Sequence, residues 1–218
     1  MRQLGLTHYV AYGSDWGSLI TARLALNHGE GLRAILITSA GLIPTIDANA
    51  PLITDEEAEW QRASAARMHP ERGYQLVQGT KPQSLAYGHT DSPMARACSI
   101  VEKFHGWTIP GEARDPPFAM DDLLANIMLY WLNGAVAPMW PYGHLGKIAP
   151  VPAGIRVAAR AGFLFSTRDL MLPPPRSWLE PIFDVGRVSI SSAIGHFPAM
   201  DDAELVADEI THFMRDVD

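Results

Sequence analysis

The sequence lacks several features that define other classes of protein. It has 218 residues, a single cysteine, Cys98, and no internal repeats or low-complexity tracts. One cysteine excludes an internal disulfide and a zinc site built from cysteines, and it fits a reducing compartment, so we expect a cytoplasmic location. No apolar run reaches the roughly 18 residues that span a bilayer, so we expect neither a membrane anchor nor a signal peptide.

Positive charge is also scarce. Lys and Arg number 17 against 24 Asp and Glu, which gives a formal net charge of −7 and argues against nucleic acid or an anionic membrane as a partner. The hydrophobic fraction of 47% and the charged fraction of 19% are typical of a globular protein with a sizeable core. Cys98 lies in an apolar helical pattern, so we expect its thiol to be buried and unreactive.

The first distinctive stretch is a tight turn between a strand and a helix. An apolar run at 7–12 precedes Gly13-Ser14-Asp15-Trp16-Gly17, and a segment with helical spacing continues to about residue 28. This is the G-x-nucleophile-x-G form of the nucleophile elbow, with Asp15 where esterases have Ser. An Asp in a Gly-rich turn can equally be only a helix cap, so the stretch by itself leaves both interpretations open.

The pattern of the remaining chain indicates an α/β fold. A continuous apolar run at 32–39 completes a βαβ unit with parallel strands. Helical patterns then dominate, including 55–68, where Thr54 and Glu57 form a capping box, 93–104 and 120–132, before strands return at 156–165 and 187–193 and a helix closes the chain at 201–215. We therefore predict a mostly parallel sheet in a core of residues 1–48 and 151–218, with a helical cap inserted at 49–150.

Two more polar residues follow the predicted third and fourth strands. Asp169 follows the strand at 156–165, and His196 follows the strand at 187–193. Each has an ordinary alternative, since Asp169 can cap a helix and a lone histidine is more often a surface-loop residue. Functional residues of open parallel sheets lie at the carboxyl ends of strands. The order Asp15, Asp169, His196 is the nucleophile, acid and base order of α/β-hydrolases.

These residue types suit a reaction in two steps. A carboxylate such as Asp15 can attack an sp³ carbon that carries an oxygen or halide leaving group, which forms an alkyl ester. Water activated by His196, with Asp169 orienting the imidazole, would then hydrolyse the ester. The oxyanion of that step needs N–H donors, and the backbone N–H of Trp16 is one candidate.

The chain resembles the epoxide hydrolases of the α/β-hydrolase superfamily, in particular the microsomal and juvenile-hormone branch. The resemblance spans nearly the whole chain and is carried by the elbow together with Gly73-Tyr74, Gln78-Gly79-Thr80-Lys81-Pro82, Asp91-Ser92-Pro93, Glu102-Lys103-Phe104, Asp121-Asp122-Leu123-Leu124, Tyr130-Trp131 and Gly195-His196-Phe197. It implies an α/β-hydrolase core with a cap, a small hydrophobic epoxide and water as substrates, a role in detoxification, and no cofactor or metal.

The resemblance also implies the role of each site residue. Asp15 is the nucleophile, Asp169 the acid that orients the base, and His196 the base. Two cap tyrosines hold and protonate the epoxide oxygen, since a phenol donates while staying neutral near pH 7. Tyr74 matches the first of these by position, and Tyr142 is the best candidate for the second, although either ring can simply pack in the cap core.

Aromatic residues of the cap suggest a bulky hydrophobic substrate. We expect Trp107, Trp131 and Trp140 to line the substrate site, although cap aromatics can also be only core residues. A haloalkane dehalogenase is the alternative enzyme, because it shares an Asp-Trp elbow. A catalytically inactive relic of an α/β-hydrolase that acts by binding is the alternative of a different class.

One part of the family pattern has no counterpart in the sequence. Family members carry four further strands and a His-Gly-Trp-Pro-type turn that supplies a second oxyanion donor, and nothing before Asp15 matches this turn. The similar His105-Gly106-Trp107 follows a helical pattern within the cap. The strand at 7–12 would then have an open edge. We therefore expect either a truncated gene product, or a chain that completes its sheet as a homodimer or with a complementing N-terminal segment.

Overall fold

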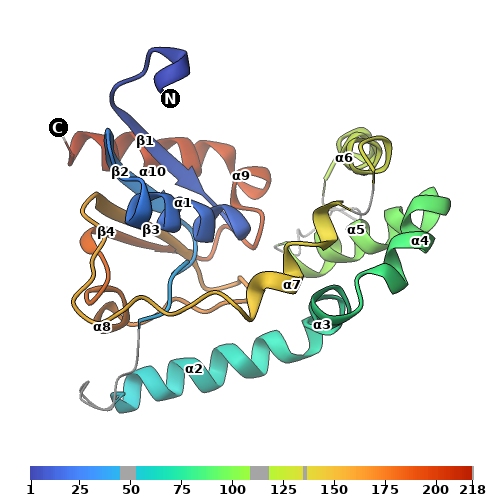
Figure 1. The fold of residues 1–218 in the computed structure, drawn as a ribbon, viewed down its shortest axis with the longest axis horizontal. Coiled ribbons are helices and arrows are strands. Elements are labelled where there is room, and N and C mark those ends of the chain that lie inside the picture. The colour runs from blue at the N-terminus through green and yellow to red at the C-terminus, as the bar shows by residue number, and fades with distance from the viewer. Residues whose placement is uncertain (45–52, 109–117, 135–136, 218) are drawn as a thin grey trace. The chain divides into compact units, whose positions relative to one another are not determined.

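The computed structural model describes residues 1–44, 53–108, 118–134 and 137–217 of the chain. The chain divides into two compact units, one formed by Met1–Ala65 and Pro150–Asp218 and the other by Ala66–Ala149 (Figure 1). The predicted boundary between residues 48 and 49 lies outside the described residues, so the predicted extent of the cap stays a prediction.

A parallel sheet of four strands forms the centre of the first unit. Its strands are adjacent in chain order, and every neighbouring pair is parallel: β1 (Tyr9–Gly13), β2 (Leu32–Ile37), β3 (Arg160–Ser166) and β4 (Asp184–Ser191). The predicted mostly parallel sheet is confirmed. β3 begins later than its apolar pattern predicts, because the N–H of Val157 donates to the carbonyl of Ile182 at 2.7 Å outside the strand ladder.

Helices pack on both faces of this sheet, because alternate side chains of a strand point to opposite faces. Ile35 and Ile37 of β2 share a buried cluster with Ala22 of α1 (Trp16–Asn27). Leu36, from the same strand, clusters instead with Phe213 of α10 (Ala203–Arg215). The unit also contains an N-terminal 3-10 turn, η1 (Arg2–Leu4), and two short helices, α8 (Arg176–Leu179) and α9 (Pro198–Asp201).

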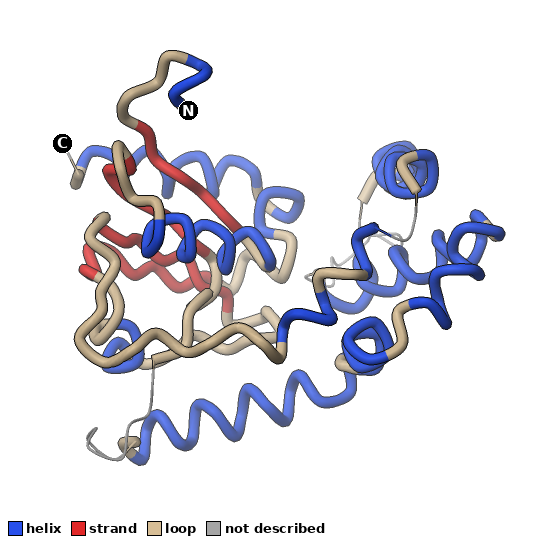
Figure 2. The backbone as a smooth tube through the Cα atoms, in the orientation of Figure 1, coloured by secondary structure: helices blue, strands red, loops and turns tan. Residues whose placement is uncertain are grey.

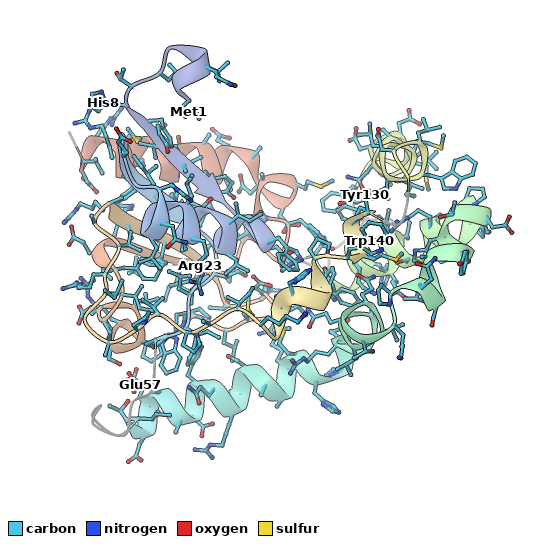
Figure 3. All side chains as sticks on the ribbon, in the orientation of Figure 1. Met1, His8, Arg23, Glu57, Tyr130 and Trp140 are labelled. Carbon is cyan, nitrogen blue, oxygen red and sulfur yellow. The ribbon has the colours of Figure 1, made fainter. Side chains whose placement is uncertain are left out.

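The start of α2 (Asp55–Met68), where Figure 3 labels Glu57, is held by side-chain hydrogen bonds within the sheet unit. The predicted capping box is confirmed: the N–H of Glu57 donates to Thr54 Oγ1 at 3.2 Å, and the N–H of Thr54 donates to Glu57 Oε2 at 2.9 Å. Ser177 Oγ also donates to Glu57 Oε1 at 2.7 Å. Trp60 Nε1 donates to the carbonyl of Leu172 at 2.8 Å.

The described part of the second unit contains helices and no strand (Figure 2). Its elements after α2 are η2 (His69–Glu71), α3 (Gly73–Thr80), α4 (Gln83–Asp91), α5 (Pro93–Trp107), α6 (Met120–Leu132), η3 (Ala137–Met139) and α7 (Tyr142–Leu145). The predicted helical segment is confirmed over these residues. Among the helices described in either unit, none combines the length and the apolar character needed to cross a bilayer.

The prediction of a buried thiol at Cys98 is wrong. Cys98 is exposed, and Met94, one turn before it on α5, is 69% exposed. The buried residues of α5 are Arg96, Phe104 and Trp107. The guanidinium carbon of Arg96 lies 5.5 Å from the ring centroid of Tyr130, so a charged residue occupies the interior face. An apolar pattern cannot anticipate this arrangement.

The turn between β1 and α1 explains why its residues are small. Asp15 has φ 48°, the only positive φ of a non-glycine among the described residues. A Cβ on Gly13 would lie 2.2 Å from the carbonyl oxygen of Gly17 and 2.7 Å from Thr21 Oγ1. Ser18 Oγ donates to the carbonyl of Gly13 at 2.9 Å. The chain therefore turns back on itself too closely for a side chain at residue 13.

Gly13→Ala should destabilise the protein, because the atom that its Cβ meets belongs to the backbone and cannot rotate away. Overpacking costs about 1–3 kcal/mol, and we expect a loss at the upper end of that range in urea unfolding. Gly17→Ala is the matched control, since a Cβ there meets nothing within 4 Å and Ala favours a helix. An equal loss in both variants would contradict this account of the turn.

Candidate active site

The structure brings the three predicted triad residues together at the carboxyl ends of the strands. Asp15 follows β1, Asp169 follows β3 and His196 follows β4. His196 Nδ1 lies 2.7 Å from Asp169 Oδ1, which is a hydrogen bond. On the other side of the ring, His196 Nε2 lies 3.8 Å from Asp15 Oδ1. One imidazole thus lies between two carboxylates.

The loop that carries Asp169 is held by local hydrogen bonds. The N–H of Leu170 donates to Asp169 Oδ1 at 2.5 Å. Ser166 Oγ accepts from the N–H of Arg168 at 2.9 Å and donates to the carbonyl of Ile194 in the histidine loop. The Asp169 side chain is buried to the same degree as that of His196, each 7% exposed. A buried, bonded carboxylate of this kind fixes the orientation and tautomer of an imidazole.

Burial and charge act in opposite directions on His196. Burial by itself would lower the pKa of His196, because it disfavours the charged ring. The hydrogen bond to Asp169 and the negative charge of that residue oppose this and outweigh it. Smaller contributions in the same direction come from Asp15 and Asp201, so the pKa of His196 is raised above its ordinary value.

Asp15 differs from Asp169 in its surroundings. Its side chain is 53% exposed, so a substrate atom can approach the carboxylate. It lies directly before the first residue of α1, Trp16. The first N–H groups of an α-helix have no acceptor within the helix, and the dipole there favours negative charge. The N-terminus of α1 therefore favours negative charge on Asp15.

A third carboxylate, Asp201, was not among the predicted site residues. It lies at the end of α9, and its Oδ2 accepts the N–H of Gly195 at 2.7 Å, directly before His196. Pro198 marks the start of a helix in the sequence, but no residue pattern shows that Asp201 at its end accepts from the histidine loop. Asp201 both fixes this loop and adds negative charge near the imidazole.

Asp201→Asn should lower the pKa of His196, because the amide oxygen can still accept from Gly195 while the charge is gone. The measurement is an NMR titration of the His196 ring, assigned by its loss in His196→Gln. Asp208→Asn is the control, since Asp208 is an exposed acid on α10 and is not among the charges that act on His196. An unchanged midpoint in Asp201→Asn would show that its charge does not act on the ring.

In the helical unit, the two predicted tyrosines lie against each other. The ring centroids of Tyr74 on α3 and Tyr142 on α7 are 5.6 Å apart in an edge-to-face arrangement. A Cβ on Gly79 would lie 3.4 Å from the carbonyl oxygen of Tyr142, an ordinary contact distance, so α3 and α7 pack closely at this point. Both tyrosines are half-buried. They are neither sealed in a core nor fully in solvent.

The three predicted tryptophans lie in different surroundings. Trp107 is 7% exposed, and its ring centroid lies 5.7 Å from that of Tyr74. Trp131 Nε1 donates to the carbonyl of Thr90 on α4 at 3.3 Å. Trp140 is 58% exposed. The structure thus brings Trp107 beside a predicted proton donor, whereas a role in substrate binding stays a prediction for all three.

Comparison with known proteins identifies homologues. A Stigmatella aurantiaca protein that carries the name epoxide hydrolase is 31% identical over 223 residues, which cover 99% of this chain and 48% of that protein. Epoxide hydrolase 1 of Sus scrofa is 27% identical over 98% of this chain and 52% of its own length. The chain is a homologue of the epoxide hydrolases. It spans about half the length of the curated relatives it matches, and no family model matches it.

Solved epoxide hydrolase structures share the fold of this homologue. The crystal structure of juvenile hormone epoxide hydrolase from Bombyx mori matches all of this chain and 56% of that chain, with a TM-score of 0.81 at 24% identity. The Aspergillus niger epoxide hydrolase matches with a TM-score of 0.77 at 23% identity, over 100% of this chain and 55% of that chain. These matches confirm that the described elements form part of an α/β-hydrolase fold.

Proposed function

We propose that the chain carries the catalytic residues of an epoxide hydrolase, which opens an epoxide to a vicinal diol through an ester on Asp15. The observation that carries the proposal is the His196 imidazole, held 2.7 Å from Asp169 and 3.8 Å from Asp15. One carboxylate is buried and bonded to the ring, and the other is half-exposed beside a helix N-terminus. The first suits orientation of a base, and the second suits attack on a substrate.

The first step of the proposed reaction forms the ester. An Asp15 carboxylate oxygen attacks a ring carbon of the epoxide, and the bond between that carbon and the epoxide oxygen breaks. The electron pair stays on the oxygen, which takes a proton from the phenol of Tyr74 or Tyr142. The products are an ester of Asp15 and a free hydroxyl group on the adjacent carbon.

The second step returns Asp15 to its carboxylate. His196 takes a proton from water, and the resulting hydroxide attacks the carboxyl carbon of the ester. The backbone N–H of Trp16 stabilises the oxyanion, and Asp169 stabilises the charged imidazole. The bond between the carboxyl carbon and the alkyl oxygen then breaks, and the alkoxide takes the proton from His196. The remaining proton of the Asp15 carboxyl group returns to the phenolate that the first step left, and the diol leaves.

The paired tyrosines favour an epoxide over a haloalkane. A halide leaves as a stable anion and needs no proton, whereas the alkoxide from an epoxide does. Two phenols with ring centroids 5.6 Å apart supply donors that a dehalogenase would not require. The position of His196 argues against a purely binding relic, because the imidazole is bonded to the buried Asp169 on one side and faces the exposed Asp15 on the other, as a general base would.

An oxygen-labelling experiment tests the proposed reaction. The purified chain is given an aryl epoxide in H₂¹⁸O for a single turnover. The mechanism places the label on the Asp15 carboxyl group and none in the diol, because the diol takes its second oxygen from Asp15. Label in the diol would mean direct attack by water. Absence of both turnover and an ester would contradict the proposal for this chain.

The open edge of the sheet points to a missing neighbour. Among the described residues, β1 pairs only with β2, and Tyr9–Tyr12 are half-buried while most of β2 is buried. We propose that a complementing segment, the counterpart of the relatives' uncovered length, pairs with β1 and supplies the second oxyanion donor. An in-frame coding sequence upstream of Met1 with strand patterns and a His-Gly-x-Pro turn would support this. Its absence would contradict it, and a stable dimer in solution would assign the edge to a second copy.

A further inference from the structure

A lysine of the helical unit faces two aromatic rings. Lys103 Nζ lies 4.7 Å from the ring centroid of Tyr74 and 5.5 Å from that of Trp107, which follows Lys103 by one turn of α5. Both distances fall within the range in which a cation is attracted to the face of a ring. The Lys103 side chain is only 17% exposed, so solvent weakens these contacts less than it would at the surface. The proposed reaction does not yet use this residue.

The rings around Lys103 are held by other contacts. Trp107 Nε1 donates to Glu71 Oε2 at 2.8 Å. Gln75 Nε2 donates to the phenol oxygen of Tyr74 at 3.1 Å. The carboxylate of Glu102 pairs with the Lys103 ammonium, but its side chain is 62% exposed, so water screens its charge. The Lys103 ammonium therefore still acts as a positive charge on the ring of Tyr74, which is more buried than Glu102.

A cation over a phenol ring changes what the phenol can do. When Tyr74 gives its proton to a developing alkoxide, negative charge appears on the phenol oxygen and in its ring. A fixed positive charge near the ring stabilises that charge, and it stabilises the neutral phenol less. The same contact restricts the rotation of the ring. Both effects act at the step in which the epoxide opens.

We propose that Lys103 is a positioning residue for Tyr74, which it holds in place and strengthens as a proton donor to the epoxide oxygen. This rests on the proposed function, in which Tyr74 protonates that oxygen. The charged groups of the cluster are Lys103, Glu102 and Glu71, and the second phenol is that of Tyr142. Among these, Lys103 is the cation whose contact with the Tyr74 ring is direct.

The test removes the charge of Lys103 and follows the ionisation of Tyr74. Phenolate formation is followed by its absorbance as a function of pH, in the wild-type chain and in each lysine variant. The same titration is repeated in each protein with Tyr74→Phe added, and the difference between the two curves is the ionisation of Tyr74. Lys103→Met, which keeps much of the apolar stem, should move this ionisation to higher pH. It should also slow ester formation in a single turnover roughly 2- to 30-fold, while Lys103→Arg restores both values. Lys147→Met, at an exposed lysine, should change neither.

The two readouts distinguish failure of this inference from failure of the proposed function. An unchanged Tyr74 ionisation in Lys103→Met, with unchanged circular dichroism, overturns the role of Lys103. A shifted ionisation with no ester in the wild-type chain overturns the proposed function, and with it the role of Lys103 in the reaction. If Lys103→Met does not fold, Lys103→Gln removes the same charge with a polar side chain, and the same outcomes apply.

Discussion

Asp15→Asn should abolish ester formation and turnover together. Loss of the nucleophile from a catalytic unit costs on the order of 10⁴- to 10⁶-fold in rate, because an amide oxygen is a far weaker nucleophile than a carboxylate. The substitution should leave the fold intact, since the side chain is 53% exposed and Asn tolerates a positive φ as Asp does. Single-turnover kinetics with an aryl epoxide, together with intact-protein mass, measure both steps.

A matched substitution distinguishes loss of the nucleophile from the mere loss of one negative charge. Asp208→Asn removes one exposed carboxylate from α10 and should retain the wild-type rate. Urea unfolding of both variants checks that neither loses stability. Residual turnover near the wild-type level in Asp15→Asn would mean that another group attacks the epoxide, and the assignment of the elbow would be wrong.

His196→Gln should have the opposite effect on the ester, which forms and then accumulates. Loss of a general base slows proton transfer by about 10²- to 10⁴-fold, and this base acts only on water in the second step. The protein mass should therefore rise by the mass of one epoxide molecule. Peptide mapping should place the adduct on Asp15.

The double variant Asp15→Asn/His196→Gln is the control for this trap, because without the nucleophile no adduct should form. His196 is 7% exposed and bonded to Asp169, so its replacement should also cost about 1–3 kcal/mol of stability. The trapping experiment is therefore run at a temperature below the thermal unfolding midpoint of the variant. Rapid turnover by His196→Gln would show that a different group activates the water.

Local signals in the sequence predicted a large part of this fold. The Thr54–Glu57 capping box and the apolar period at 120–132 gave two helices with the bounds that the structure has. The small residues around Asp15 gave the turn, because the close approach of Gly13 to Gly17 is a steric demand of the local chain. Each of these features depends on residues that are neighbours in the sequence.

Features that depend on distant contacts could not be predicted in this way. Cys98 is exposed because α5 turns Arg96 inward toward Tyr130, a residue of another helix. The sequence did not predict Asp201 as a site residue, because its role depends on a hydrogen bond from the backbone of Gly195, which no residue pattern encodes. The contact between the Lys103 ammonium and the Tyr74 ring likewise joins two helices, so the sequence segment Glu102-Lys103-Phe104 does not by itself predict it.

The position of one imidazole between two carboxylates has a consequence for the order of events. In the resting protein the charge of Asp15 helps to raise the pKa of His196. Once Asp15 becomes an ester, that charge is gone, and the pKa of His196 falls toward the value set by burial, Asp169 and Asp201. In the proposed reaction, ester formation thus shifts His196 toward its neutral form, which is the form that takes a proton from water in the second step.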